Sequence, residues 1–314
     1  MREPLPEPLR EPVVDAHHHI WRQADLPWLQ GEMQPRIFGE YRAIMRDYPI
    51  EEFREDVAGQ NVVASVYVQA NWPPHRALDE ARWVDGVADG EGAGWPQAIV
   101  AFADLGAPNA ARALEELAAI RRVTGVRQQL HWHEKPLYRF AGRPDAMADP
   151  SWREGFRRLA AQGLLFELQI FTSQMRDGAA LADDFPDTTI VLEHAGMLED
   201  RSPEGWSAWR TGMRELARRP NVHVKLSGLG TFVRAAGADL MRPVVEETVA
   251  LFSPARCVWG SNFPIEKLWT DYDALCDAFR ETVAGLTATE RDAVLCGNAM
   301  RLYRIEAGQG AAHG

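Results

Sequence analysis

Eight short runs of apolar and β-branched residues recur along the chain, and a stretch with apolar residues at helical spacing follows each of them. Such runs predict buried strands, and the stretches between them predict amphipathic helices. The predicted strands are 13–20, 62–70, 97–105, 124–130, 164–170, 188–195, 221–227 and 257–262. The predicted helices are 51–60, 76–89, 109–122, 151–162, 174–184, 205–219, 239–252 and 271–285, with a further helix over 288–303.

This alternation implies parallel strands joined by crossover helices, and eight such units is the number that closes a barrel. The predicted fold is therefore α/β, a single-domain (β/α)8 TIM-like barrel over residues 13–305. We expect a flexible N-terminal segment over 1–12 and a flexible tail over 306–314. A doubly wound open sheet is the rival fold, but no glycine-rich phosphate loop follows any predicted strand.

Polar residues gather near the carboxyl ends of the predicted strands. Because side chains alternate along a strand, one face can pack on the helices while the other looks into the barrel. The polar residues assigned to the inward faces are Asp15, His17, His19, Tyr67, Gln69, Arg127, Gln129, Glu167, Gln169, His194, His223, Lys225, Ser227 and Asn262. Catalytic groups of such barrels lie at this end. Two long loops, 22–50 and 131–150, are expected to lie over it.

Three histidines are candidate metal ligands. His17 and His19 are two residues apart and share one face of the first strand, whereas His18 points the other way. The alternative is a structural histidine cluster whose ring nitrogens bind backbone carbonyls. His194, at the end of the sixth strand, is a third candidate ligand or a catalytic base.

Two inward cations and two tryptophans are candidates for substrate binding. Arg127 and Lys225 can each form a buried ion pair with Glu167 or Asp15, or bind a substrate carboxylate. Substrate binding is favoured for Arg127, and both roles stay open for Lys225. The inward amides Gln69 and Gln169 are further candidates for contact with the substrate. Trp72 and Trp269 follow predicted strands and can either stack on a ring of the substrate or only pack against the protein.

Composition narrows the function classes. A net charge of −11 over 314 residues argues against a nucleic-acid partner, which would need a basic surface. No apolar run is long enough for a membrane helix, and the charged, proline-rich start is not a secretory signal. Cys257, Cys276 and Cys296 are isolated and predict reduced thiols in a cytoplasmic protein. We expect a small-molecule substrate, and a homo-oligomer stays open.

Five motifs together resemble one enzyme family across nearly the whole chain: VVDAHHHIW, LEHAG, VKLSGL, GSNFP and GNAMRLYRI. They resemble the amidohydrolase-2 group of the amidohydrolase superfamily, and within it the lactonase branch with fuconolactonase-like and pyrone-dicarboxylate-lactonase-like hydrolases. The resemblance implies a distorted barrel that hydrolyses a ring ester with His17, His19, His194 and a strand-eight carboxylate, with Arg127 on the substrate. It also implies at most one divalent metal, zinc first among the candidates, or none. Arg127 on strand four argues against the two-metal sites of the superfamily, which use a bridging lysine or glutamate.

One motif departs from the family. The strand-eight residue is usually an aspartate that binds metal and activates water, and here it is Asn262. A carboxamide cannot take a proton near neutral pH. Either Glu167 or His194 assumes the role of the base, or the reaction differs. Asn262 can still orient a water or donate a hydrogen bond to an oxyanion.

The leading prediction is a hydrolase of a lactone or related cyclic ester of a small polar or acidic molecule. One alternative is a decarboxylase or hydratase, since the same superfamily contains both. The other is a ligand-binding barrel without catalysis, for which the missing aspartate is the best evidence.

Overall fold

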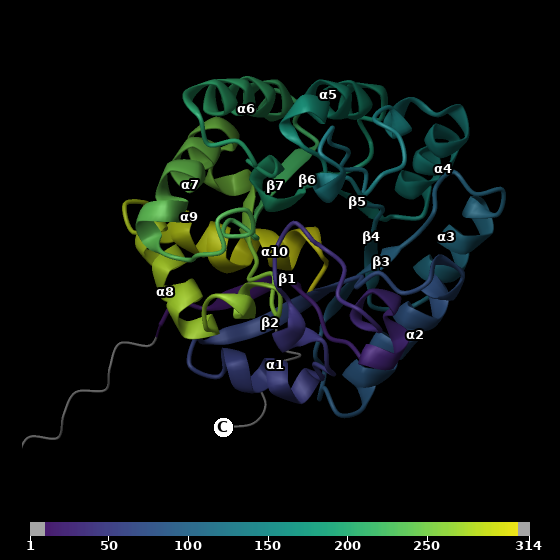
Figure 1. The fold of residues 1–314 in the computed structure, drawn as a ribbon, viewed down its shortest axis with the longest axis horizontal. Helices are drawn as coiled ribbons and strands as arrows, with labels where there is room; N and C mark the ends of the chain where they lie inside the picture. Colours follow the sequence, from purple (N-terminus) through teal and green to yellow (C-terminus); the bar gives the residue numbers. More distant parts are fainter. Residues whose placement is uncertain (1–9, 307–314) are drawn as a thin grey trace, which may run out of the picture.

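Eight parallel strands form one sheet in chain order, and the helices surround it (Figure 1). The computed structural model describes residues 10–306. The strands are β1 Val13–His18, β2 Val62–Val68, β3 Ala98–Phe102, β4 Val123–Arg127, β5 Leu165–Leu168, β6 Ile190–Leu192, β7 Val222–Leu226 and β8 Cys257–Trp259. All eight predicted strands are therefore confirmed, and the fold is the predicted single-domain (β/α)8 TIM barrel.

The barrel closes where the chain after β8 meets β1. The backbone N–H of Asn262 donates to the carbonyl of His17 at 2.7 Å, and that of His19 donates to the carbonyl of Phe263 at 2.8 Å. The approach is close enough to require glycine at position 260, because a Cβ there would lie 2.6 Å from the Cβ of His17. The closure thus brings Asn262 beside the histidines of β1.

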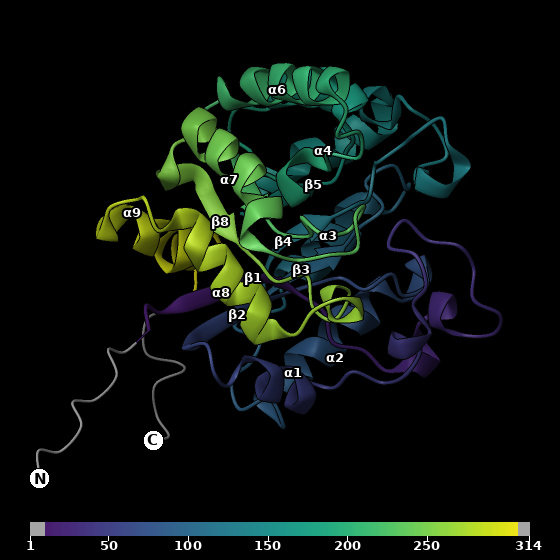
Figure 2. The same cartoon turned by 60° about the vertical axis from the view of Figure 1, so that its left-hand side comes forward.

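The outer layer consists of helices that follow the strands (Figures 1 and 2). They are α1 Ile50–Val57, α2 Ala77–Asp89, α3 Ala110–Ala118, α4 Pro150–Ala161, α5 Met175–Asp184, α6 Pro203–Ala217, α7 Ala238–Phe252 and α8 Tyr272–Val283. The predicted helix over 288–303 is divided into α9 Ala288–Asp292, a π-helical turn over Ala293–Gly297, and α10 Asn298–Leu302. In Figure 2 the long purple segment after β1 lies on the opposite side of the barrel from α9.

Strict alternation along the strands holds for most, but not all, of the inward assignments. Asp15 lies between Val14 and Ala16, which point into the barrel, and it accepts a hydrogen bond from Tyr272 of α8 at 3.0 Å. The register of β1 against β2 shifts only after Asp15. Tyr67 likewise points outward, where its hydroxyl donates to Glu80 of α2 at 2.8 Å. Both inward assignments were wrong, because each side chain satisfies its polar group against the helical layer.

The barrel interior is mostly apolar below the strand ends. Valines from five strands pack there with Tyr303, which follows α10; they are Val14, Val66, Val100, Val191 and Val258. On β6 the inward position is thus Val191, whereas Ile190 and Leu192 pack with the helices. The prediction for that strand was one residue out of step, because the strand ends at Leu192 and a turn follows.

No helix within residues 10–306 is long and apolar enough to cross a membrane. The predicted flexible ends fall mainly on residues 1–9 and 307–314, which lie outside the described part of the chain. Within the predicted N-terminal segment, the guanidinium of Arg10 donates to Asp277 of α8 at 2.7 Å.

Candidate active site

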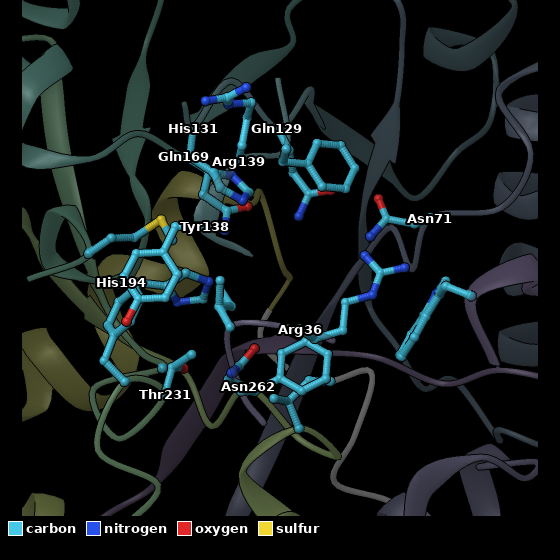
Figure 3. Close-up of a pocket in the computed structure, with 18 of the residues that line it drawn as sticks. Arg36, Asn71, Gln129, His131, Tyr138, Arg139, Gln169, His194, Thr231 and Asn262 are labelled. Atoms are coloured by element: carbon cyan, nitrogen blue, oxygen red, sulfur yellow. The ribbon is translucent and has the colours of Figure 1, made fainter. Parts of the chain in front are cut away.

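A cavity of about 200 Å3 opens at the carboxyl ends of the strands (Figure 3). Its polar wall comes from the ends of β1, β2, β4, β5, β6 and β8 and comprises His19, Gln69, Arg127, Gln129, Gln169, His194 and Asn262. Its rim comes mainly from the two predicted loops, with Trp28, Arg36 and Phe38 from the first and Tyr138, Arg139 and Phe140 from the second. The cavity therefore lies where the barrel fold predicts an active site.

Of the two candidate ligands from β1 and its end, His19 lines this cavity, and the ring of His17 lies 5.1 Å from it between centroids. Nδ1 of His19 lies 2.7 Å from the carbonyl oxygen of Val68, which leaves Nε2 free. His17 is fully buried, and neither of its ring nitrogens forms a hydrogen bond in the described structure, although Nδ1 lies 3.3 Å from a carboxylate oxygen of Glu193. His18 points away as predicted and stacks on Phe53 of α1 at 3.8 Å between ring centroids.

The third histidine arrives through a left-handed turn rather than through strand alternation. Glu193 continues the inward alternation of Val191. After it, His194 and Ala195 have positive φ angles of 53° and 47°, so the chain reverses and the His194 ring lies 4.9 Å from that of His17 between centroids. Nδ1 of His194 lies 2.9 Å from the Ser227 hydroxyl after β7, which leaves Nε2 free. The glycine after Ser227 makes room for this ring, because a Cβ on Gly228 would lie 2.6 Å from Nδ1 of His194.

Ligand atoms of His17, Glu193 and His194 lie within 4.8 Å of one another, and the His19 ring centroid is 5.1 Å from that of His17. Burial, together with the nearby Arg127 cation, lowers the pKa of His19 and of His194 to about 3. Both rings are therefore neutral at physiological pH, as metal ligation requires. The orphaned nitrogens of His17 and the fixed Nδ1 atoms of the other rings fit a metal site. The cluster thus suggests one divalent metal.

Arg127 lines the cavity but is already paired. Its guanidinium lies 3.1 Å from a carboxylate oxygen of Glu193, and a second nitrogen donates to the carbonyl of Gln69 at 2.6 Å. Burial opposes ionisation of Glu193, yet the Arg127 charge holds the pKa of that carboxyl below its usual value. Sequence reasoning missed Glu193 because strand alternation assigned it to the outer face. Its position beside the candidate ligand His194 was the available signal.

Lys225 and Glu167 form a separate buried pair inside the barrel. Nζ of Lys225 lies 2.5 Å from Oε1 of Glu167, which also accepts a hydrogen bond from the Tyr303 hydroxyl at 2.7 Å. Both charged side chains are fully buried, and neither lines the cavity. Of the two roles considered for Lys225, the structure shows the buried ion pair. Glu167 does not face the cavity, where a general base would have to lie.

Asn262 occupies the strand-eight position of the cavity wall with a left-handed φ of 61°. Behind it lies Glu266, which is 1% exposed and accepts a hydrogen bond from the Trp269 indole at 2.7 Å. Burial raises the pKa of Glu266 to about 8, although interactions with Trp269, Asn262 and Thr231 act in the opposite direction. A carboxyl group is thus present near Asn262, one layer behind the cavity wall.

The two predicted substrate-stacking tryptophans lie outside the cavity wall. Trp72 stacks on Trp83 of α2 at 5.7 Å between ring centroids, and the Trp269 indole is bonded to Glu266. Both tryptophans therefore pack against the protein, which is the alternative role considered for them. The cavity is bordered instead by Trp21 and Trp28, which belong to the first long loop and its approach.

The chain is similar to known proteins over nearly its whole length. The model of the amidohydrolase family, Amidohydro_2, matches residues 14–305. The chain is 37% identical over 298 residues to an uncharacterised protein, y4mH, of Sinorhizobium fredii, which covers 93% of this chain and 98% of that protein. It is 29% identical over 310 residues to an L-fucono-1,5-lactonase of Burkholderia ambifaria, with 96% and 98% covered. A solved amidohydrolase of Burkholderia multivorans with bound zinc superposes with a TM-score of 0.78 at 27% identity, with 94% and 99% covered.

Proposed function

The chain belongs to the amidohydrolase family, and from this premise we propose that it is a hydrolase that opens a lactone or related cyclic ester of a small polar or acidic molecule. One observation carries the proposal: the buried His17 ring lies 5.1 Å from that of His19 and 4.9 Å from that of His194 between centroids, and the latter two line the cavity. Each of the three histidines has a ring nitrogen free of hydrogen bonds. The 29% identity to lactonases over almost the full chain supports a ring ester as the substrate.

We propose that His17, His19 and His194 hold one divalent metal, with zinc as the first candidate. The ligand atoms that already lie within 4.8 Å of one another are those of His17, Glu193 and His194, so Glu193 would adjoin the ion. The zinc-bound relative supports this choice. When bound, such an ion polarises an ester carbonyl and lowers the pKa of a water. Whether as ligand or as proton acceptor, His194 would act through Nε2, because Ser227 engages Nδ1.

The residues of the wall would orient the substrate. Asn262 has an amide at the strand-eight position, where it can orient the attacking water or donate to the developing oxyanion. Glu193 balances the charge of Arg127 and fixes its side chain at the cavity, where Nε of Arg127 has no hydrogen-bond partner and can donate to the substrate. Gln69 and Gln169 lie on the same wall and can bind ring oxygens. Glu167, bonded to Lys225 inside the barrel, has no direct step in this proposal.

A panel of γ- and δ-lactones of sugar acids, assayed with a pH indicator, tests the function. We expect one acid equivalent per lactone and no gas, and loss of the rate in His194→Asn. Aromatic and unsaturated acids are assayed in parallel, and release of carbon dioxide from them would overturn hydrolysis in favour of a lyase. Elemental analysis of the same sample is expected to give at most one metal per chain, and two equivalents would contradict the one-metal site.

A further inference from the structure

The cavity is cationic although the chain as a whole is acidic. Three arginines line it, Arg36, Arg127 and Arg139, and no aspartate or glutamate of residues 10–306 lines it with them. The chain carries a net charge of −11. A cavity of one charge sign within a protein of the opposite net charge attracts ligands selectively by charge. Glu193 balances the charge of Arg127 from outside the wall, but Arg36 and Arg139 form no ion pair with a described residue, so their charges favour an anionic ligand.

The three arginines differ in what they already bind. Arg127 is paired with Glu193, and Arg139 donates to the carbonyls of His133 and Glu134. Arg36 makes no side-chain hydrogen bond or ion pair to any residue that the structure describes, and its Nε is buried without a partner. Arg36 thus has an unused guanidinium at the cavity.

The position of Arg36 suits a ligand in the cavity. Its guanidinium carbon lies 5.6 Å from the centre of the Trp28 ring, which supports the cation through its aromatic face. In Figure 3 the side chain extends into the cavity toward Asn71. A planar guanidinium with free donors can bind a carboxylate through two parallel hydrogen bonds.

Three amides on the opposite part of the wall also keep unused polar atoms. Nε2 of Gln69, Oε1 of Gln129 and Oε1 of Gln169 are buried without hydrogen-bond partners in the described chain. They come from the ends of β2, β4 and β5. Buried amides need partners, and the hydroxyl groups of a ring can both donate to them and accept from them.

We propose that the substrate is an anionic lactone, a hydroxylated ring ester bearing a separate carboxylate, and that Arg36 binds this carboxylate while the three glutamines bind the ring hydroxyls. The proposal rests on lactone hydrolysis and adds the charge class of the substrate and the residue that selects it. Arg36 lies on the loop after β1, so selection would come from the rim and hydrolysis from the floor of the cavity.

The kinetic test uses a matched pair, D-glucono-1,4-lactone and D-glucaro-1,4-lactone, which differ in the oxidation of the terminal carbon. We expect the wild-type enzyme to prefer the carboxylated lactone. Arg36→Met should lower kcat/KM for it by about 10- to 100-fold, mainly through KM, because a charge-assisted pair is lost. The neutral lactone should change less than about two-fold, and Arg36→Lys should recover part of the loss.

Arg42→Met is the matched control, because Arg42 is an exposed arginine of the same loop that bonds to Glu40 and does not line the cavity. It should leave both substrates unchanged. Equal rates for the two lactones in the wild type, or an equal loss for both in Arg36→Met, would overturn the proposal while hydrolysis itself stands.

A binding test separates this proposal from the reaction. Calorimetry with D-glucuronate and D-glucose, which contain no ester, should show tighter binding of the acid, and Arg36→Met should abolish the difference. If no lactone is hydrolysed but glucuronate binds through Arg36, lactone hydrolysis fails and the anion site remains. If glucuronate binds no better than glucose, the anion site fails.

Discussion

At the scale of single residues, the partner of a buried charge decides its role. Arg127 and Lys225 both point inward from their strands, as their alternation predicts. Arg127 pairs with Glu193 at the cavity, whereas Lys225 pairs with Glu167 below it. A buried charge needs a partner close by, since leaving it unpaired costs several kcal/mol, of the order of 3–5. The position of the carboxylate partner therefore determines whether each cation lies at the cavity or below it.

Asn262 and Glu266 provide a prediction at the same scale. Asn262→Asp restores the residue usual in the family but adds a carboxyl group next to the buried Glu266, and two adjacent carboxylates oppose ionisation of each other. We expect the single variant to lose thermal stability above neutral pH and to lose kcat. The double variant Asn262→Asp/Glu266→Gln should recover both, as a double-mutant cycle of Tm and kcat would measure.

Glu266→Gln alone is the reference that completes this cycle. Additive effects of the two substitutions would contradict a direct interaction between positions 262 and 266. An Asn262→Asp variant that is as stable as the wild type above neutral pH would also contradict this interaction.

At the scale of elements, the turn after β6 and the chain after β7 position His194 together. Gly228 has a φ of 59°, and a Cβ there would meet the His194 ring at 2.6 Å. Ser227, one residue earlier, engages Nδ1 of the same ring. The candidate catalytic imidazole of His194 is thus held in place by residues that follow the neighbouring strand.

Gly228→Ala should therefore displace the His194 ring and cost at least about 10-fold in kcat, since small displacements of reacting groups are costly. The control is Gly86→Ala within α2, where an added Cβ meets nothing within 4 Å. That variant should keep full activity and gain up to about 1 kcal/mol of stability from helix propensity. Unchanged kcat in Gly228→Ala would show that the ring position does not depend on this glycine.

At the scale of the whole molecule, buried carboxyls make the stability of the barrel depend on pH. Glu80 of α2 is buried against β2, where it accepts hydrogen bonds from the Tyr67 hydroxyl and the Ala70 backbone. Burial raises its pKa from 4.5 to about 7 in the folded protein. Between these two pH values the folded state retains a proton that the unfolded state releases. The free energy of unfolding therefore falls as pH rises through this range.

Glu80→Gln removes this titration and keeps an oxygen that can accept both hydrogen bonds. The stability of the variant relative to the wild type should increase by about 3 kcal/mol between about pH 4.5 and about pH 7, from the size of the pKa shift. Chemical denaturation at several pH values measures the difference. Glu51→Gln, on the exposed side of α1, is the matched control. A difference that is constant with pH would contradict the role given to Glu80.

Much of this molecule follows from local pattern. Apolar runs with helical stretches between them predict the eight strands in their order. This is possible because a buried strand and a buried helix face each require apolar residues at a characteristic spacing. The same periodicity placed His17, His19, Gln69, Arg127, Gln169 and Asn262 at the strand ends, where the structure brings them or their neighbours to one cavity.

The tertiary structure decided the features that have no local pattern. The register of β1 shifts between Asp15 and His18, so Asp15 contacts α8 whereas His19 lines the cavity. The left-handed turn after β6 brings the His194 ring beside that of His17. The pair between Arg127 and Glu193 joins residues 66 positions apart. Arg36 reaches the cavity from a loop whose own sequence has no strand period. Periodicity records which face of an element is buried, whereas ion pairs, register shifts and loop positions depend on which elements meet, and only the folded barrel brings those elements together.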